Sequence, residues 1–259
     1  KTFPGEPQVN LSLAARHSQN TRTNSVNLSL PTLQLSMSRI YPLAPTTGSK
    51  KGFIENINLQ YNLRAENQIN TADSLFLTPA MFDDAVAATR VILEDNNWPV
   101  ILCGDSAGGN LTLAAVNALK SAGERLPDAV IAFSPATDLS WGSASLSRKA
   151  EVDPILDPNL LPFVSMAYVQ DGTDMSDPRI SPLEGNLFDL PPTLIQCGEA
   201  EILLDDSRRY ATQAQDCGSP VTLSLRPDMP HVFVGFAPLL SAANAALKEA
   251  REFLDATLA

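Results

Sequence analysis

The sequence has few of the residues that build disulfide frameworks and metal centres. Its 259 residues include three cysteines and two histidines. Cys103, Cys197 and Cys217 fit no zinc-ligand spacing, and an odd number argues against a disulfide scaffold. Cys103 and Cys197 lie in short apolar runs that are typical of buried strands. We therefore expect reduced, structural thiols in a reducing compartment, and no metal site.

Basic residues are also scarce. Lysine and arginine together number 18 and aspartate and glutamate 29, so the formal charge is −11. An acidic chain repels phosphate backbones, which makes nucleic acid an unsuitable partner. No apolar run approaches the ~18 residues of a membrane span. Residues 1–15 lack the apolar segment of a secretory signal. These absences predict a cytoplasmic protein with no membrane span.

The pattern from Pro99 onward predicts an α/β fold. Short apolar runs alternate with segments of helical spacing, which is typical of a mostly parallel central sheet with helices on both faces. We expect strands at residues 100–103, 129–133, 193–197 and 221–225. We expect helices at residues 81–94, 110–120, 204–215 and 239–258.

Two parts of the chain do not follow this alternation. Residues 138–183 are rich in aspartate and proline, with one helical piece near residues 159–169, and they follow a strand end. The first eighty residues predict no firm elements, although residues 33–41 alternate like a half-exposed strand. We expect one domain over residues 1–259, with a small helical cap from about residues 1–30 and 140–175.

The sequence Gly-Asp-Ser-Ala-Gly at residues 104–108 matches G-x-S-x-G between a predicted strand and a predicted helix. That context is what a nucleophilic serine requires, because the serine sits on a strained turn that needs small neighbours. Ser106 is the predicted nucleophile. The backbone N–H of Ala107, at the start of the helix, is a predicted oxyanion donor.

A serine hydroxyl needs a base, and the chain order selects one. In hydrolases whose G-x-S-x-G serine lies between a strand and a helix, the catalytic residues follow one another along the chain as serine, acid and histidine. His231 is the only histidine after Ser106, since His17 precedes it. An acid should follow a strand between them and accept a hydrogen bond from the imidazole. Glu201 is favoured and Asp205 is the next candidate; for Asp205 and Asp206, stabilisation of the helix dipole is the favoured role.

The residues from Trp98 to the C-terminus resemble the bacterial hormone-sensitive-lipase-like esterases, a family of α/β-hydrolases. The matching sequences are G-D-S-A-G-G-N at 104–110, S-P-A-T-D-L at 134–139, D-P-R-I-S-P-L at 177–183, L-P-P-T-L-I at 190–195, G-E-A-E-I-L-L-D-D-S at 198–207 and D-M-P-H-V-F at 228–233. The resemblance implies Ser106 as nucleophile, Glu201 as acid and His231 as base. It also implies a cap, no cofactor, small acyl esters as substrates and a homodimer.

The upstream part departs from that family. The H-G-G-G loop that donates hydrogen bonds to the oxyanion is not in this sequence, and Gly52 is its candidate remnant. Losing one oxyanion donor typically costs a factor of ~10²–10³ in rate. If the loop is absent, a non-catalytic binding protein on the same fold is an alternative to an esterase. An amide or lactone hydrolase with the same triad is a second alternative, because the acyl chemistry is the same and only the shape of the pocket would discriminate.

Candidates for the substrate pocket come from two places. Phe163 and Tyr168 lie in the expected cap, and Asp105 and Val232 adjoin the predicted catalytic residues. Trp141, Leu160 and Met166 share the apolar spacing of the cap, for which packing within the cap is the commoner reason.

Overall fold

A computed structural model describes residues 9–20, 25–40, 59–72, 79–95, 98–169 and 174–259. The chain divides into two compact units, Lys1–Phe76 and Leu77–Ala259. The single domain expected over residues 1–259, with a cap from about residues 1–30 and 140–175, stays a prediction.

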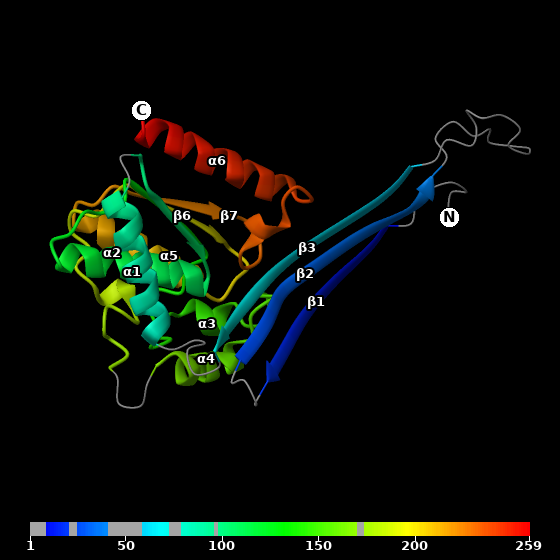
Figure 1. The fold of residues 1–259 in the computed structure, drawn as a ribbon, viewed down its shortest axis with the longest axis horizontal. Helices are drawn as coiled ribbons and strands as arrows, with labels where there is room; N and C mark the ends of the chain where they lie inside the picture. The colour runs from blue at the N-terminus through cyan, green and yellow to red at the C-terminus, as the bar shows by residue number, and fades with distance from the viewer. Residues whose placement is uncertain (1–8, 21–24, 41–58, 73–78, 96–97, 170–173) are drawn as a thin grey trace, which may run out of the picture. The chain divides into compact units, whose positions relative to one another are not determined.

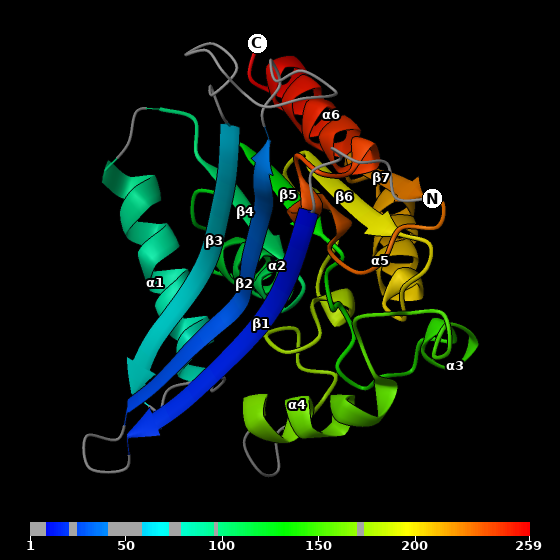
Figure 2. The same cartoon turned by 90° about the vertical axis from the view of Figure 1, so that its right-hand side faces the viewer.

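The first unit contains a three-stranded antiparallel sheet. Its strands are β1 (Val9–Asn20), β2 (Ser25–Ile40) and β3 (Leu59–Ala72), with β2 in the centre (Figure 2). Apolar positions face each other in the register: Leu11 pairs with Leu35, which in turn pairs with Leu63. The strand expected at residues 33–41 is confirmed within β2. Strands β1 and β3 were not expected.

The second unit is built on a parallel sheet. Its strands run in the order β4 (Ile101–Asp105), β5 (Ala129–Phe133), β6 (Thr193–Gly198) and β7 (Val221–Arg226). All three pairings are parallel. Because parallel strands run in the same direction, their carboxyl ends meet at one edge of the sheet. The four expected strands are confirmed.

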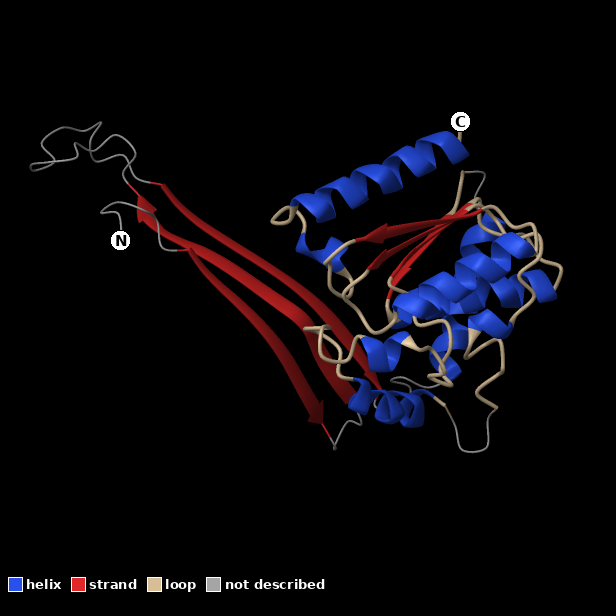
Figure 3. Ribbon diagram, turned by 180° about the vertical axis from the view of Figure 1, so that it is seen from behind, coloured by secondary structure: helices blue, strands red, loops and turns tan. Residues whose placement is uncertain are grey.

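Helices cover both faces of this sheet (Figures 1 and 3). Helices α2 (Ala107–Ser121) and α5 (Leu204–Asp216) pack on one face, and α6 (Ser241–Thr257) packs against β5 and β6 on the other. Helix α1 (Pro79–Asp95) packs against α2. Among the described residues, no helix is both long enough and apolar enough to cross a membrane.

Strand β4 is less buried than its apolar sequence predicts. Cys103 is exposed, and Ile101 is 36% exposed. Among the described elements, α2 packs on β4, whereas α6 packs against β5 and β6, so one face of β4 has less cover from helices. The expectation of a buried thiol is therefore wrong for Cys103. It is confirmed for Cys197, where burial raises the pKa of the thiol well above its usual value.

The segment after β5 folds into short helices. These are α3 (Ser145–Arg148), the 3-10 turn η2 (Pro158–Leu160), α4 (Leu161–Tyr168) and the 3-10 turn η3 (Pro182–Glu184). A separate apolar cluster forms here, in which Leu139 and Leu161 pack with Ile202 and Leu203. The helical piece expected near residues 159–169 is confirmed.

Candidate active site

Ser106 occupies the turn between β4 and α2. Its backbone has φ 54° and ψ −116°, a conformation that costs a serine free energy and persists only where the surroundings hold it. Its N–H donates to the carbonyl of Phe133, and its own carbonyl accepts from Asn110 N–H, at 2.9 and 3.0 Å. These bonds tie the turn to the end of β5 and to the first turn of α2.

Two glycines permit this turn. A Cβ atom on Gly104 would lie 2.2 Å from the carbonyl oxygen of Gly108, and one on Gly109 would lie 2.9 Å from Cβ of Pro135. The backbones of β4, α2 and the loop after β5 therefore approach more closely than side chains allow. Small residues in the motif are needed for this packing.

Gly104→Ala is expected to lower the free energy of unfolding by about 1–3 kcal/mol or more, because the new methyl group meets backbone atoms that cannot move aside. Urea denaturation measures this. Gly108→Ala is the control, since a Cβ there meets nothing within 4 Å. Equal losses in the two variants would contradict the close packing at Gly104.

His231 follows β7 and is 4% exposed. Its Nε2 lies 2.9 Å from Ser106 Oγ, and its Nδ1 lies 3.1 Å from Glu201 Oε1. The loop before it passes close to Gly198, where a Cβ would lie 2.1 Å from the carbonyl oxygen of Met229. The imidazole thus bridges a hydroxyl and a carboxylate from separate loops.

Glu201 is fully buried, three residues beyond β6. Its Oε2 accepts from Ser134 Oγ at 2.7 Å and from Gly198 N at 3.0 Å. Asp205, the other candidate acid, lies at the start of α5 and accepts a hydrogen bond from Arg148 of α3 instead. The structure therefore brings Ser106, His231 and Glu201 together. Their catalytic roles stay predictions.

Asp206 does more than complement the dipole of α5. Its carboxylate is fully buried and accepts from the backbone N–H groups of Thr137 and Asp138 and from Ser143 Oγ. Burial raises the pKa of Asp206 to about 6. This side chain fixes the segment after β5 to α5.

The remaining predicted residues are placed as follows. Ala107 is the exposed first residue of α2, Asp105 is the exposed last residue of β4, and Val232 donates its N–H to Ser134 Oγ at 3.1 Å. Gly52 and the side chains of Phe163 and Tyr168 lie outside the described residues. Sequence reasoning missed Ser134, whose only signal was its place in S-P-A-T-D-L.

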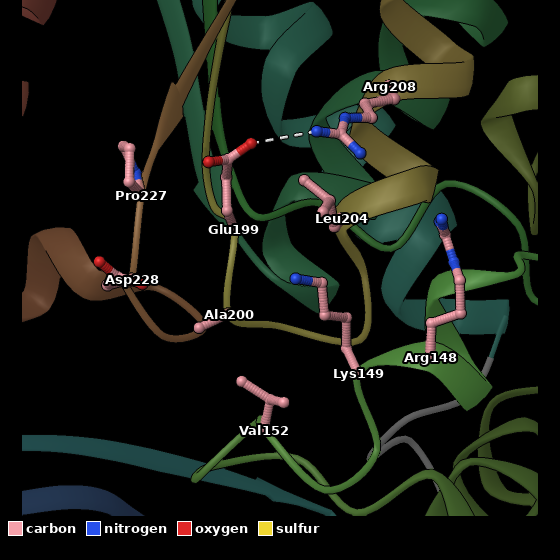
Figure 4. Close-up of a pocket in the computed structure, with 9 residues that line it drawn as sticks. All are labelled: Arg148, Lys149, Val152, Glu199, Ala200, Leu204, Arg208, Pro227 and Asp228. Carbon is pink, nitrogen blue, oxygen red and sulfur yellow. Dashed lines mark hydrogen bonds and ion pairs between the residues drawn. The ribbon is translucent and has the colours of Figure 1, made fainter.

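A pocket of about 290 Å³ lies beside the acid and histidine loops (Figure 4). None of Ser106, Glu201 and His231 lines it. Five charged side chains line it together with Val152, Ala200, Leu204 and Pro227, and the Arg208–Glu199 ion pair lies in its wall. Within the described parts of the chain, no cluster of three or more histidine, cysteine or acidic residues could hold a metal ion.

The parallel sheet, the strained serine turn and the serine–histidine–glutamate contacts are those of an α/β-hydrolase. The family model described as alpha/beta hydrolase fold matches residues 77–235, which is more than half of the chain. The chain belongs to this family. The predicted fold class is thereby confirmed.

Known proteins similar to this chain are esterases. An acetyl-hydrolase of Streptomyces hygroscopicus is 41% identical over 178 residues, which cover 68% of this chain and 59% of that protein. An esterase of Acinetobacter venetianus is 38% identical over 154 residues, which cover 60% of this chain and 51% of that protein. The chain thus spans between half and three fifths of these two relatives.

Solved structures give the same family. The hormone-sensitive lipase homologue EstE7, from a metagenome library, matches with a TM-score of 0.68 at 29% identity, covering 99% of this chain and 89% of that one. EstE5 matches with a TM-score of 0.66 at 35% identity, covering 69% of this chain and 61% of that one. The structural neighbours are bacterial hormone-sensitive-lipase-family esterases, which confirms the predicted resemblance.

A second family model matches the other end of the chain. The model described as LptD protein matches residues 1–94, which is fewer than half of the residues. The hydrolase match begins at residue 77, where the second structural unit also begins. The two matches overlap over residues 77–94, so the match to the LptD model covers the first unit and extends into the start of the second.

Proposed function

We propose that this protein is a serine carboxylesterase that hydrolyses short-chain acyl esters through an acyl-enzyme on Ser106. The observation that carries the proposal is the continuous contact from Ser106 Oγ to His231 Nε2 and from His231 Nδ1 to Glu201 Oε1. A nucleophile and a base within hydrogen-bond reach, with the base oriented by a third group, are what acyl transfer requires.

The first half of the reaction forms the acyl-enzyme. Ser106 Oγ attacks the ester carbonyl while His231 Nε2 takes the hydroxyl proton, giving a tetrahedral oxyanion. His231 then gives that proton to the leaving alcohol as the carbon–oxygen bond breaks. Glu201, fully buried and facing Nδ1, stabilises the imidazolium that exists between these two transfers.

The second half releases the acid. A water molecule gives its proton to His231 and attacks the acyl carbon, and the imidazolium then returns a proton to Ser106 Oγ as the carboxylic acid leaves. The N–H of Ala107, at the N-terminus of α2, is a donor to both oxyanions. No cofactor is needed in any of these steps.

Hydrolysis of p-nitrophenyl acetate, butyrate and laurate tests the proposal. We expect acetate and butyrate to be turned over faster than laurate, in line with the acetyl-hydrolase among the relatives. Ser106→Ala supplies the background rate. A folded protein with no turnover above that background would remove the esterase proposal. Preference for laurate would contradict only the short-chain part.

A further inference from the structure

Ser134, at the end of β5, links Glu201, which follows β6, to the loop after β7 that carries His231. It directly follows β5, is fully buried, and donates from Oγ to Glu201 Oε2 at 2.7 Å. The same oxygen accepts from Val232 N–H at 3.1 Å, one residue beyond His231. The Ser134 backbone is itself fixed, because its N–H donates to the carbonyl of Gln196 in β6 at 2.8 Å.

We infer that Ser134 is a positioning residue for the reaction proposed above, on which this inference rests. The hydroxyl has one proton, and Val232 N–H is a donor, so that proton must go to Glu201. Oε2 of Glu201 is then held by Ser134 and by Gly198 N–H, which leaves Oε1 to face His231. Ser134 therefore fixes the rotation of the carboxylate and the position of the histidine loop with one atom.

The backbone supports a functional reason for this contact. Ser134 has φ 47° and Val232 has φ 49°, and these two strained residues meet through the serine hydroxyl. Ser106, with φ 54°, stands at the end of the neighbouring strand β4. Strained residues persist where the surroundings hold them, and they concentrate at functional sites.

Ser134→Ala is expected to lower kcat by about 10- to 100-fold with KM unchanged, because small displacements of a catalytic group cost factors of this size. The ester substrate does not contact Ser134 in this mechanism, so its binding should not change. The wild-type protein is measured first with p-nitrophenyl acetate. If it shows no turnover, the proposed function fails before the inference is reached.

Ser143→Ala is the matched control. Ser143 is 5% exposed, lies on the same segment after β5, and also donates to a buried carboxylate, that of Asp206 in α5. Both variants lose one buried serine–carboxylate hydrogen bond, so both should unfold at lower urea concentrations. Only Ser134→Ala should lower kcat.

A double-mutant cycle tests whether Ser134 acts through Glu201. In the Glu201→Gln background, we expect Ser134→Ala to have almost no further effect on kcat, because the carboxylate that it holds is gone. Three results would overturn the inference in an active enzyme: an unchanged kcat in Ser134→Ala, an equal kcat loss in Ser143→Ala, or a full Ser134→Ala effect on top of Glu201→Gln.

Discussion

Ser106→Ala should lower kcat for a short-chain ester by about 10⁶-fold, the loss that follows removal of the nucleophile in comparable triads. Without the hydroxyl, no acyl-enzyme forms, and His231 has no proton to take from Ser106. The Ala107 N–H and the substrate-binding contacts remain, so the variant should keep a small rate above that of water. Burst and steady-state kinetics with p-nitrophenyl acetate measure the loss.

Ser147→Ala is the control for this variant. Ser147 is an exposed serine of α3 whose hydroxyl bonds to the carbonyl of Ala144. It should retain full activity. Both variants should unfold at the wild-type urea concentration, which separates loss of chemistry from loss of structure. Substantial turnover by folded Ser106→Ala would assign the nucleophile elsewhere.

Glu201→Gln should lower kcat by about 10⁴-fold while the fold is kept. The side chain keeps its size, but an amide can present an N–H to His231 Nδ1 where the carboxylate accepted a hydrogen bond. The histidine is then held in the wrong tautomer, and its Nε2 cannot accept the proton of Ser106. Steady-state kinetics with p-nitrophenyl acetate measure the loss, and urea denaturation checks that the fold is kept.

Asp205→Asn separates the two acids that the sequence left open. Asp205 pairs with the exposed side chain of Arg148, and exposed ion pairs contribute little. This variant should keep nearly wild-type kcat. A large loss in Asp205→Asn with a small loss in Glu201→Gln would reverse the assignment of the acid.

The second unit could be predicted from the sequence because its signals are local. Strands β5 and β6 are short apolar runs, and helices cover both faces of each. A continuous apolar run is the sequence pattern of such a fully buried strand, so the pattern predicts these strands correctly. The serine turn was recognisable because its small residues are needed for close backbone approach. Chain order alone selected His231, since only one histidine follows Ser106.

Long-range contacts explain what the sequence did not show. The exposure of Cys103 depends on which helix covers β4, and the burial of Asp206 depends on amides 68 and 69 residues away. Nothing in the sequence distinguishes Ser134 from the other serines, because only the fold brings Glu201 and Val232 to its hydroxyl. Polarity, spacing and local motif carry none of this information.

Strands β1 and β3 of the first unit were missed for a different reason. Asparagine recurs in both strands and serine in β1, and these residues also favour loops. A signal was present, because the pentapeptide V-N-L-S-L occurs at residues 9–13 and again at 26–30, each with alternating apolar positions. The repeat predicts similar strands, although the two copies do not pair with each other in the register.

Covalent labelling tests the central claim, a nucleophilic Ser106 activated by His231, without depending on the choice of ester. A phosphonyl fluoride reacts with such a serine by forming an oxygen–phosphorus bond and releasing fluoride. Intact-protein and peptide mass spectrometry should show one phosphonyl group, placed on Ser106, and none in the His231→Ala protein. A folded wild-type protein that stays unmodified, or that is modified on another residue, would contradict the account.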